Sequence, residues 1–93
     1  MEIREMIEAN AKSLRSDAEV VDYKTTGATD GRTIYGVCFW KHSNEGGADG
    51  FEYVTHQFYI RHGEEEAFFE VGHYWFNKEE AERDWQIRKE RGY

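Results

Sequence analysis

The chain lacks most of the features that crosslink a protein or place it in a membrane. Its 93 residues include no proline and a single cysteine, Cys38, which excludes an internal disulfide. No apolar run approaches the roughly 20 residues of a membrane span, and the charged N-terminal segment has no apolar core like that of a signal peptide. We therefore expect a protein of a reducing compartment, the cytoplasm, with no part in a membrane.

Basic residues are also scarce. The 12 Lys and Arg stand against 19 Asp and Glu, which gives a formal net charge of −7. Phosphate backbones are bound by clustered Lys and Arg, so we expect no direct contact with nucleic acid. An acidic surface instead favours a basic protein as the partner. The alternative interpretation is that the charge only keeps the protein in solution.

Aromatic side chains are what the chain has in quantity. They make up 16% of its residues, within an apolar share of only 39%. A chain of this length buries roughly two-thirds of the surface that its unfolded form exposes, which suffices for one modest core. Large rings supply much of that buried area. We therefore expect a single domain over residues 1–93.

Periodicity and turn signals predict an α+β fold. Apolar residues recur at helical spacing near the N-terminus, and Asn77 and Gly92 are suited to begin and end a last helix. Asp30–Gly31 and Gly63–Glu64 are typical of tight hairpin turns. The expected elements are a helix over 2–16, four strands at 20–23, 32–42, 51–62 and 66–76 in an antiparallel meander with 25–31 as a connection, and a helix over 78–91.

The third and fourth strands predict two different sheet faces. If a two-residue turn joins them, Phe58 lies opposite Phe69 and Val54 lies opposite His73. The face with these residues is the more aliphatic one, and we expect both helices to cover it. The other face is rich in tyrosine and stays open to water. That face suits a binding surface or a homodimer contact, unless its aromatics merely fit a strand well.

Catalytic and metal motifs are weak. His56 and His73 fall on the same predicted face, but the histidine spacings match no zinc motif. Cys38 lies within an apolar strand, where thiols are mostly inert. We therefore predict no catalytic residue, no metal and no cofactor, and we keep as an alternative a small enzyme or ligand-binding domain that uses His56 and His73.

Acidic residues gather around the polar loop at 43–50, around the turn at 63–64 and at the start of the last helix. Carboxylates with tyrosines between them can stand in for the phosphates of a nucleic acid on a basic protein surface. The residues predicted to bind a partner are Glu45, Asp49, Glu52, Tyr53, Tyr59, Glu64, Glu65, Glu66, Glu70 and Tyr74.

In size, charge and layout the chain resembles the small acidic inhibitors of phages and mobile elements, such as anti-CRISPR and anti-restriction proteins. No motif carries this resemblance, so it assigns no residue. It implies a non-enzymatic inhibitor, in the cytoplasm of the host if a phage encodes it, that covers the basic nucleic-acid-binding surface of a target protein. An antitoxin or nuclease immunity protein, and a self-assembling module, are the alternatives.

Overall fold

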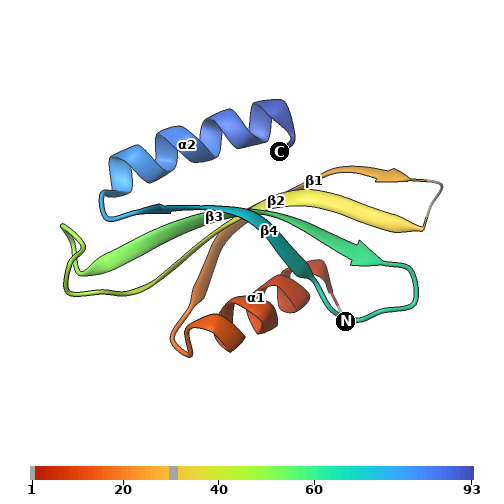
Figure 1. Cartoon of the computed structure of the whole chain (residues 1–93), viewed down its shortest axis with the longest axis horizontal. Coiled ribbons are helices and arrows are strands. Elements are labelled where there is room, and N and C mark those ends of the chain that lie inside the picture. The colour runs from red at the N-terminus through yellow and green to blue at the C-terminus, as the bar shows by residue number, and fades with distance from the viewer. Residues whose placement is uncertain (1, 30–31) are drawn as a thin grey trace.

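The computed structural model describes residues 2–29 and 32–93 (Figure 1). The four strands form one antiparallel sheet in the order β1-β2-β3-β4, which confirms the predicted meander between two helices. No described helix is long and apolar enough to cross a membrane. The elements are α1 (Ile3–Leu14), β1 (Glu19–Thr29), β2 (Thr33–Ser43), β3 (Phe51–Arg61), β4 (Phe68–Trp75) and α2 (Lys78–Arg91).

The two helices cover opposite faces of the sheet, with α2 above it and α1 below it in Figure 1. The prediction that both helices share one face is therefore wrong. The physical reason lies in β2, where the consecutive residues from Gly36 to Trp40 are all buried. A strand with apolar side chains on both faces needs a cover on both faces.

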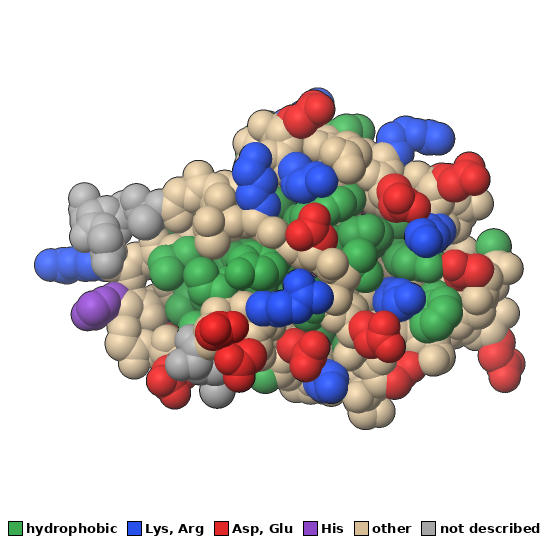
Figure 2. Space-filling view, turned by 180° about the vertical axis from the view of Figure 1, so that it is seen from behind, with side chains coloured by type: hydrophobic (Ala, Val, Ile, Leu, Met, Phe, Trp, Pro, Cys, Tyr) green, Lys and Arg blue, Asp and Glu red, His purple; other side chains and the backbone are tan. Residues whose placement is uncertain are grey.

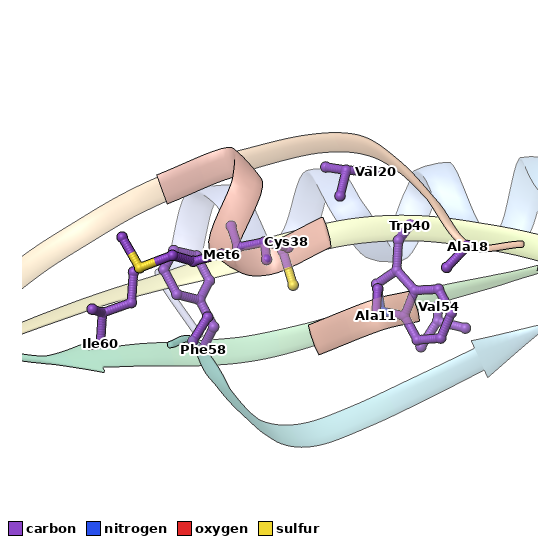
Figure 3. Packing of buried hydrophobic residues seen from close by; sticks show 11 residues of the cluster. Met6, Ala11, Ala18, Val20, Cys38, Trp40, Val54, Phe58 and Ile60 are labelled. Atoms are coloured by element: carbon purple, nitrogen blue, oxygen red, sulfur yellow. The ribbon is translucent and has the colours of Figure 1, made fainter. Parts of the chain in front are cut away.

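On the α1 side, the helix inserts its apolar stripe into the larger of the two cores. Met6 lies beside Phe58 and Ile60, and Ala11 lies beside Trp40 (Figure 3). These side chains belong to α1 and to the two central strands β2 and β3, so their burial ties the N-terminal helix to the centre of the sheet. This core is the one that the helical spacing of the first apolar residues predicts.

On the α2 side, the core is smaller and mostly aromatic. Ala81 and Trp85 are buried against Val37, Phe39 and Tyr53. The Trp85 ring lies 5.7 Å from that of Phe39, centroid to centroid. The predicted caps of α2 are confirmed: the Asn77 side chain accepts a hydrogen bond from the Glu80 N–H, and Gly92 has a φ of 84°. Two buried apolar residues are few for a helix of 14 residues, so polar contacts must hold the rest of it.

Strand β1 is longer than the sequence predicts. The segment from Thr25 to Thr29, expected as a connection, pairs with β2 in the register Thr25–Gly36 and Gly27–Tyr35. Thr25 and Thr26 are exposed, and their β-branched side chains fit a strand although they bury little. The predicted turn at Asp30–Gly31 lies outside the described residues.

A β-bulge changes the register between β3 and β4. Phe58 pairs with Phe69, as predicted, but Val54 pairs with Tyr74 and not with His73. Two residues of β4, Val71 and Gly72, stand opposite the single residue His56. The extra residue places every later residue of β4 on the face opposite to the predicted one. Because of this shift, His73 and Trp75 turn toward α2, and the Tyr74 hydroxyl turns toward His56 at 3.5 Å.

Val71 has a φ of 45° and is the only non-glycine residue with a positive φ in the described part of the chain. A left-handed backbone costs roughly 1–2 kcal/mol for a residue with a Cβ, and a β-branched residue suits it least. Val71→Gly should therefore leave the free energy of unfolding unchanged or raise it by about 1 kcal/mol, as measured by urea denaturation.

Val21 provides the matched control, since it is a strand valine of similar exposure (43% against 58%) whose φ is not positive. Val21→Gly should lower the free energy of unfolding by about 1 kcal/mol, because glycine loses more entropy in a strand. Equal losses in both variants would show that the backbone of Val71 stores no strain.

Candidate protein-binding surface

Three segments far apart in the sequence meet at one end of the sheet. They are the α1–β1 connection, the loop at 44–50 and the connection from β4 to α2 (Figure 1). The Ala48 N–H donates to the Phe76 carbonyl at 2.9 Å and so fastens the loop to the start of α2. The Asp17 carboxylate accepts from the Ser43 N–H at 2.8 Å and fastens the first connection to β2.

Most of the charge at this end is negative, and we call it the acidic end. Phe76, with 51% of its surface exposed, lies among these charges. Four basic residues, Arg15, Lys41, Lys78 and Arg83, accompany seven acids. The exposed acids of the acidic end are Asp17, Glu19, Glu45, Asp49, Glu79, Glu80 and Glu82. Two of the three acidic groups of the sequence, the loop and the start of the last helix, are therefore one surface.

Tyr53 lies beneath the acidic end and does not belong to its surface. It is buried under α2, and its hydroxyl donates to Asp49 at 2.6 Å. Burial, together with that hydrogen bond, raises the pKa of Tyr53 to about 12. The same hydrogen bond lowers the pKa of Asp49, which keeps its carboxylate charged. The prediction that Tyr53 contacts a partner is wrong, because the second helix covers its face of the sheet.

Glu52 is also absent from the candidate surface. Its carboxylate lies 2.7 Å from Nε2 of the buried His42, and only a small part of its side chain is exposed. The His42 Nδ1 lies 2.9 Å from the carbonyl of Ser43 at the end of β2. Glu52 therefore holds an internal contact between β2 and β3.

The other predicted contact residues lie elsewhere. The exposed residues Glu64, Glu65 and Glu66 lie in the connection between β3 and β4 at the opposite end of the sheet, where the last two border a pocket of about 280 Å³ against α1. This connection covers residues 62–67, so the prediction of a two-residue turn at Gly63–Glu64 is wrong. Tyr74 is exposed on the α1 side. The ten predicted residues are thus spread over separate regions, and only Glu45 and Asp49 are exposed at the acidic end.

Tyr59 and Glu70 lie on the part of the α2 face that the helix leaves uncovered. The Tyr59 ring stacks on Phe68 at 5.2 Å and lies 6.5 Å from Tyr35. The Arg61 guanidinium lies 5.4 Å from the Tyr59 centroid. Glu70 borders a pocket of about 320 Å³ with Tyr35, Tyr59 and Arg61. The predicted open tyrosine face is therefore confined to this row of rings.

The two histidines of the enzyme hypothesis do not share a site. His56 lies in the α1-side core, where its ring stacks on Phe69 at 4.7 Å and its Nδ1 accepts from Trp40 Nε1 at 3.1 Å. His73 contacts Asp84 of α2 on the other side of the sheet. Cys38 is fully buried, and burial raises its pKa to about 12, so its thiol stays protonated. Within residues 2–29 and 32–93, no group of three His, Cys, Asp or Glu is arranged to hold a metal ion.

Asp84 is a residue whose role the sequence did not reveal, since it counts there as one more acid at the start of a helix. Its carboxylate accepts hydrogen bonds from Thr55 Oγ1 at 2.6 Å, from His73 Nδ1 at 3.0 Å and from Trp75 Nε1 at 3.3 Å. Arg88 Nε lies 3.7 Å away. Burial raises the pKa of Asp84, but these donors outweigh burial and the pKa is lowered overall. The sequence did contain one signal for this role. Asp84 and Arg88 have the i,i+4 spacing of an ion pair on one helix face, next to the buried residues Ala81 and Trp85.

Comparison of the chain with protein-family models, with curated proteins and with solved structures finds no match.

The pKa of His56 predicts how stability depends on pH. Burial, followed by the charge of Arg88, lowers this pKa from 6.5 to about 4. The unfolded chain therefore takes up a proton first as the pH falls, and stability is lost between about pH 6.5 and pH 4. The full difference corresponds to at most about 3 kcal/mol. Urea denaturation at several pH values across this window measures it.

His56→Gln removes the titrating group and can retain an acceptor for Trp40 Nε1. The variant should be less stable at pH 7 but should lose much less stability toward pH 4 than the parent. The exposed His62 is the control, and His62→Gln should keep the parental slope. An unchanged slope in His56→Gln would assign the acid sensitivity to other groups.

Proposed function

We propose that the protein is a non-enzymatic inhibitor that places its acidic end on the basic surface of another protein. The observation that carries the proposal is the convergence of three acidic segments around the exposed ring of Phe76. Exposed carboxylates attract a basic partner over a distance of about one Debye length, and a ring at the centre supplies apolar contact area. Basic surfaces of this kind are typical of proteins that bind nucleic acid.

The distribution of charge supports the acidic end as the surface that contacts the partner. Over the face seen in Figure 2, acidic side chains lie among basic and apolar ones and do not form a continuous field. The acidic end has seven exposed acids with four bases, so it has the local excess that electrostatic complementarity requires. A partner that normally holds phosphates would meet carboxylates in their place.

Among inhibitors with this electrostatic design, we propose the anti-defence type, acting in the cytoplasm of a host cell on a nucleic-acid-processing complex. An antitoxin or nuclease immunity protein uses the same electrostatics and is the second candidate. The two differ in the partner, which is a defence complex in the first case and a toxin in the second. Identification of the partner therefore separates them.

Capture of host proteins on the tagged chain, followed by mass spectrometry, tests the proposal. We expect a basic, nucleic-acid-binding protein that is retained at about 50 mM NaCl and largely released at about 500 mM, because exposed charge pairs are screened by salt. The purified pair should then compete with the partner's nucleic acid in a fluorescence polarisation assay. A complex that is indifferent to salt, or a partner without a basic surface, would contradict the proposal.

Charge reversal locates the contact. The double variant Glu45→Lys, Glu82→Lys alters two exposed acids of the acidic end and should weaken binding by about tenfold or more. The control Glu64→Lys, Glu90→Lys makes the same change in net charge outside the acidic end and should weaken binding by less than about threefold. Circular dichroism checks that both variants fold. Equal weakening in both would show that only net charge matters, which would remove the acidic end as the site.

A further inference from the structure

A groove runs between β4 and the C-terminal half of α2, away from the acidic end. It encloses about 380 Å³, within the range of small-molecule pockets. Val71, at the bulge of β4, borders it on the sheet side, while Ile87 and Tyr93 border it on the helix side. All three are large apolar residues that stay exposed, with 58%, 42% and 61% of their surfaces accessible. Their concentration around one hollow gives the groove apolar walls.

Arg88 gives the same groove a cationic group. Only 2% of its surface is exposed. One terminal nitrogen donates to the carbonyl of Val71, and Nε lies 3.7 Å from Asp84. The other terminal nitrogen, NH1, is buried and makes no hydrogen bond to any residue that the structure describes. A buried donor in this state needs an explanation, and a guanidinium edge is suited to bind a carboxylate or a phosphate.

The balance of charge in the groove differs from that of the whole protein. Asp84 is the one acid among the described residues that line it, and Arg88 and Arg91 are both there. The Asp84 carboxylate is already engaged by Thr55, His73 and Trp75, so its oxygens are turned into the fold. In a chain with a net charge of −7, this groove therefore carries a local excess of positive charge.

The backbone at the edge of the groove is also unusual. Val71 adopts its left-handed φ of 45° at this point, and its carbonyl is the group that Arg88 binds. Strained residues of this kind persist where the surrounding structure fixes them, and they cluster at ligand sites.

We propose that the groove binds a small organic anion. Its carboxylate or phosphate group lies on Arg88 and Arg91, and its apolar body lies against Ile87 and Tyr93. This site is separate from the protein-binding end and does not depend on the proposed function. The proposal requires only that the groove bind ligands that have both an anionic group and an apolar body.

Titration of the ¹⁵N-labelled full chain at low salt tests this selection. Benzoate supplies both features, benzyl alcohol supplies the ring without the charge, and acetate and inorganic phosphate supply the charge without the ring. We expect benzoate to saturate with a Kd on the order of 1 mM, with shifts centred on Val71, Ile87 and Arg91. Each of the other probes should bind at least about fivefold more weakly, about 1 kcal/mol by the factor of ten per 1.4 kcal/mol.

Two variants and a control complete the test. Arg91→Gln should weaken benzoate by about fivefold or more, and Ile87→Asp should abolish its binding, because a carboxylate in the wall repels the anion. Arg83→Gln removes an exposed arginine of the same helix that does not line the groove, and should leave the Kd unchanged. No saturation up to about 20 mM would overturn the proposal. Equal binding of benzyl alcohol, or equal effects of Arg91→Gln and Arg83→Gln, would also overturn it.

Discussion

The carboxylate of Asp84 receives donors from β3 and β4 and lies beside Arg88 of its own helix, and the position of α2 on the sheet depends on this contact. Ala81 and Trp85 are the only apolar residues that α2 itself buries. A hydrogen-bonded group of this kind holds its members cooperatively, and loss of one member leaves the others buried and unpaired. The C-terminal helix α2 is thus held on the sheet mainly by hydrogen bonds and an ion pair, whereas the N-terminal helix α1 is held mainly by buried apolar surface.

The bulge at Val71 and the contacts of Asp84 are parts of one arrangement. Without the extra residue in β4, His73 and Trp75 would face α1, and Asp84 would lose two of its three donors. Arg88 then closes the arrangement, because it binds the carbonyl of the bulge and also faces Asp84. The strained residue, the buried charges and the placement of the helix therefore have a common origin in the register of one edge strand.

Much of this fold could be predicted from sequence. The apolar spacing of α1 and the caps at Asn77 and Gly92 are local signals, and the structure confirms them. The bulge was missed, although Gly72, an isolated glycine within the predicted strand, was a signal for it. The glycine alone does not fix whether the register shifts. The sequence did not predict a helix on each face of the sheet. The reason is that the buried stripe of α2 includes the charged residue Arg88 and does not stand out in a highly charged sequence. For the candidate surface, the acidic groups were evident, but their meeting around Phe76 depends on contacts across three connections.

The unequal attachment of the helices has a consequence for local unfolding. The buried apolar cluster beside α1 has eleven members among the described residues, and the cluster beside α2 has five. Segments with few buried apolar contacts open at the lowest free energy, so α2 is the element that detaches first while the sheet and α1 remain folded. Such an opening would uncover Val37, Phe39 and Tyr53 together. We therefore expect a minor native state in which an aromatic sheet face is free, and amide hydrogen exchange in α2 would report its population.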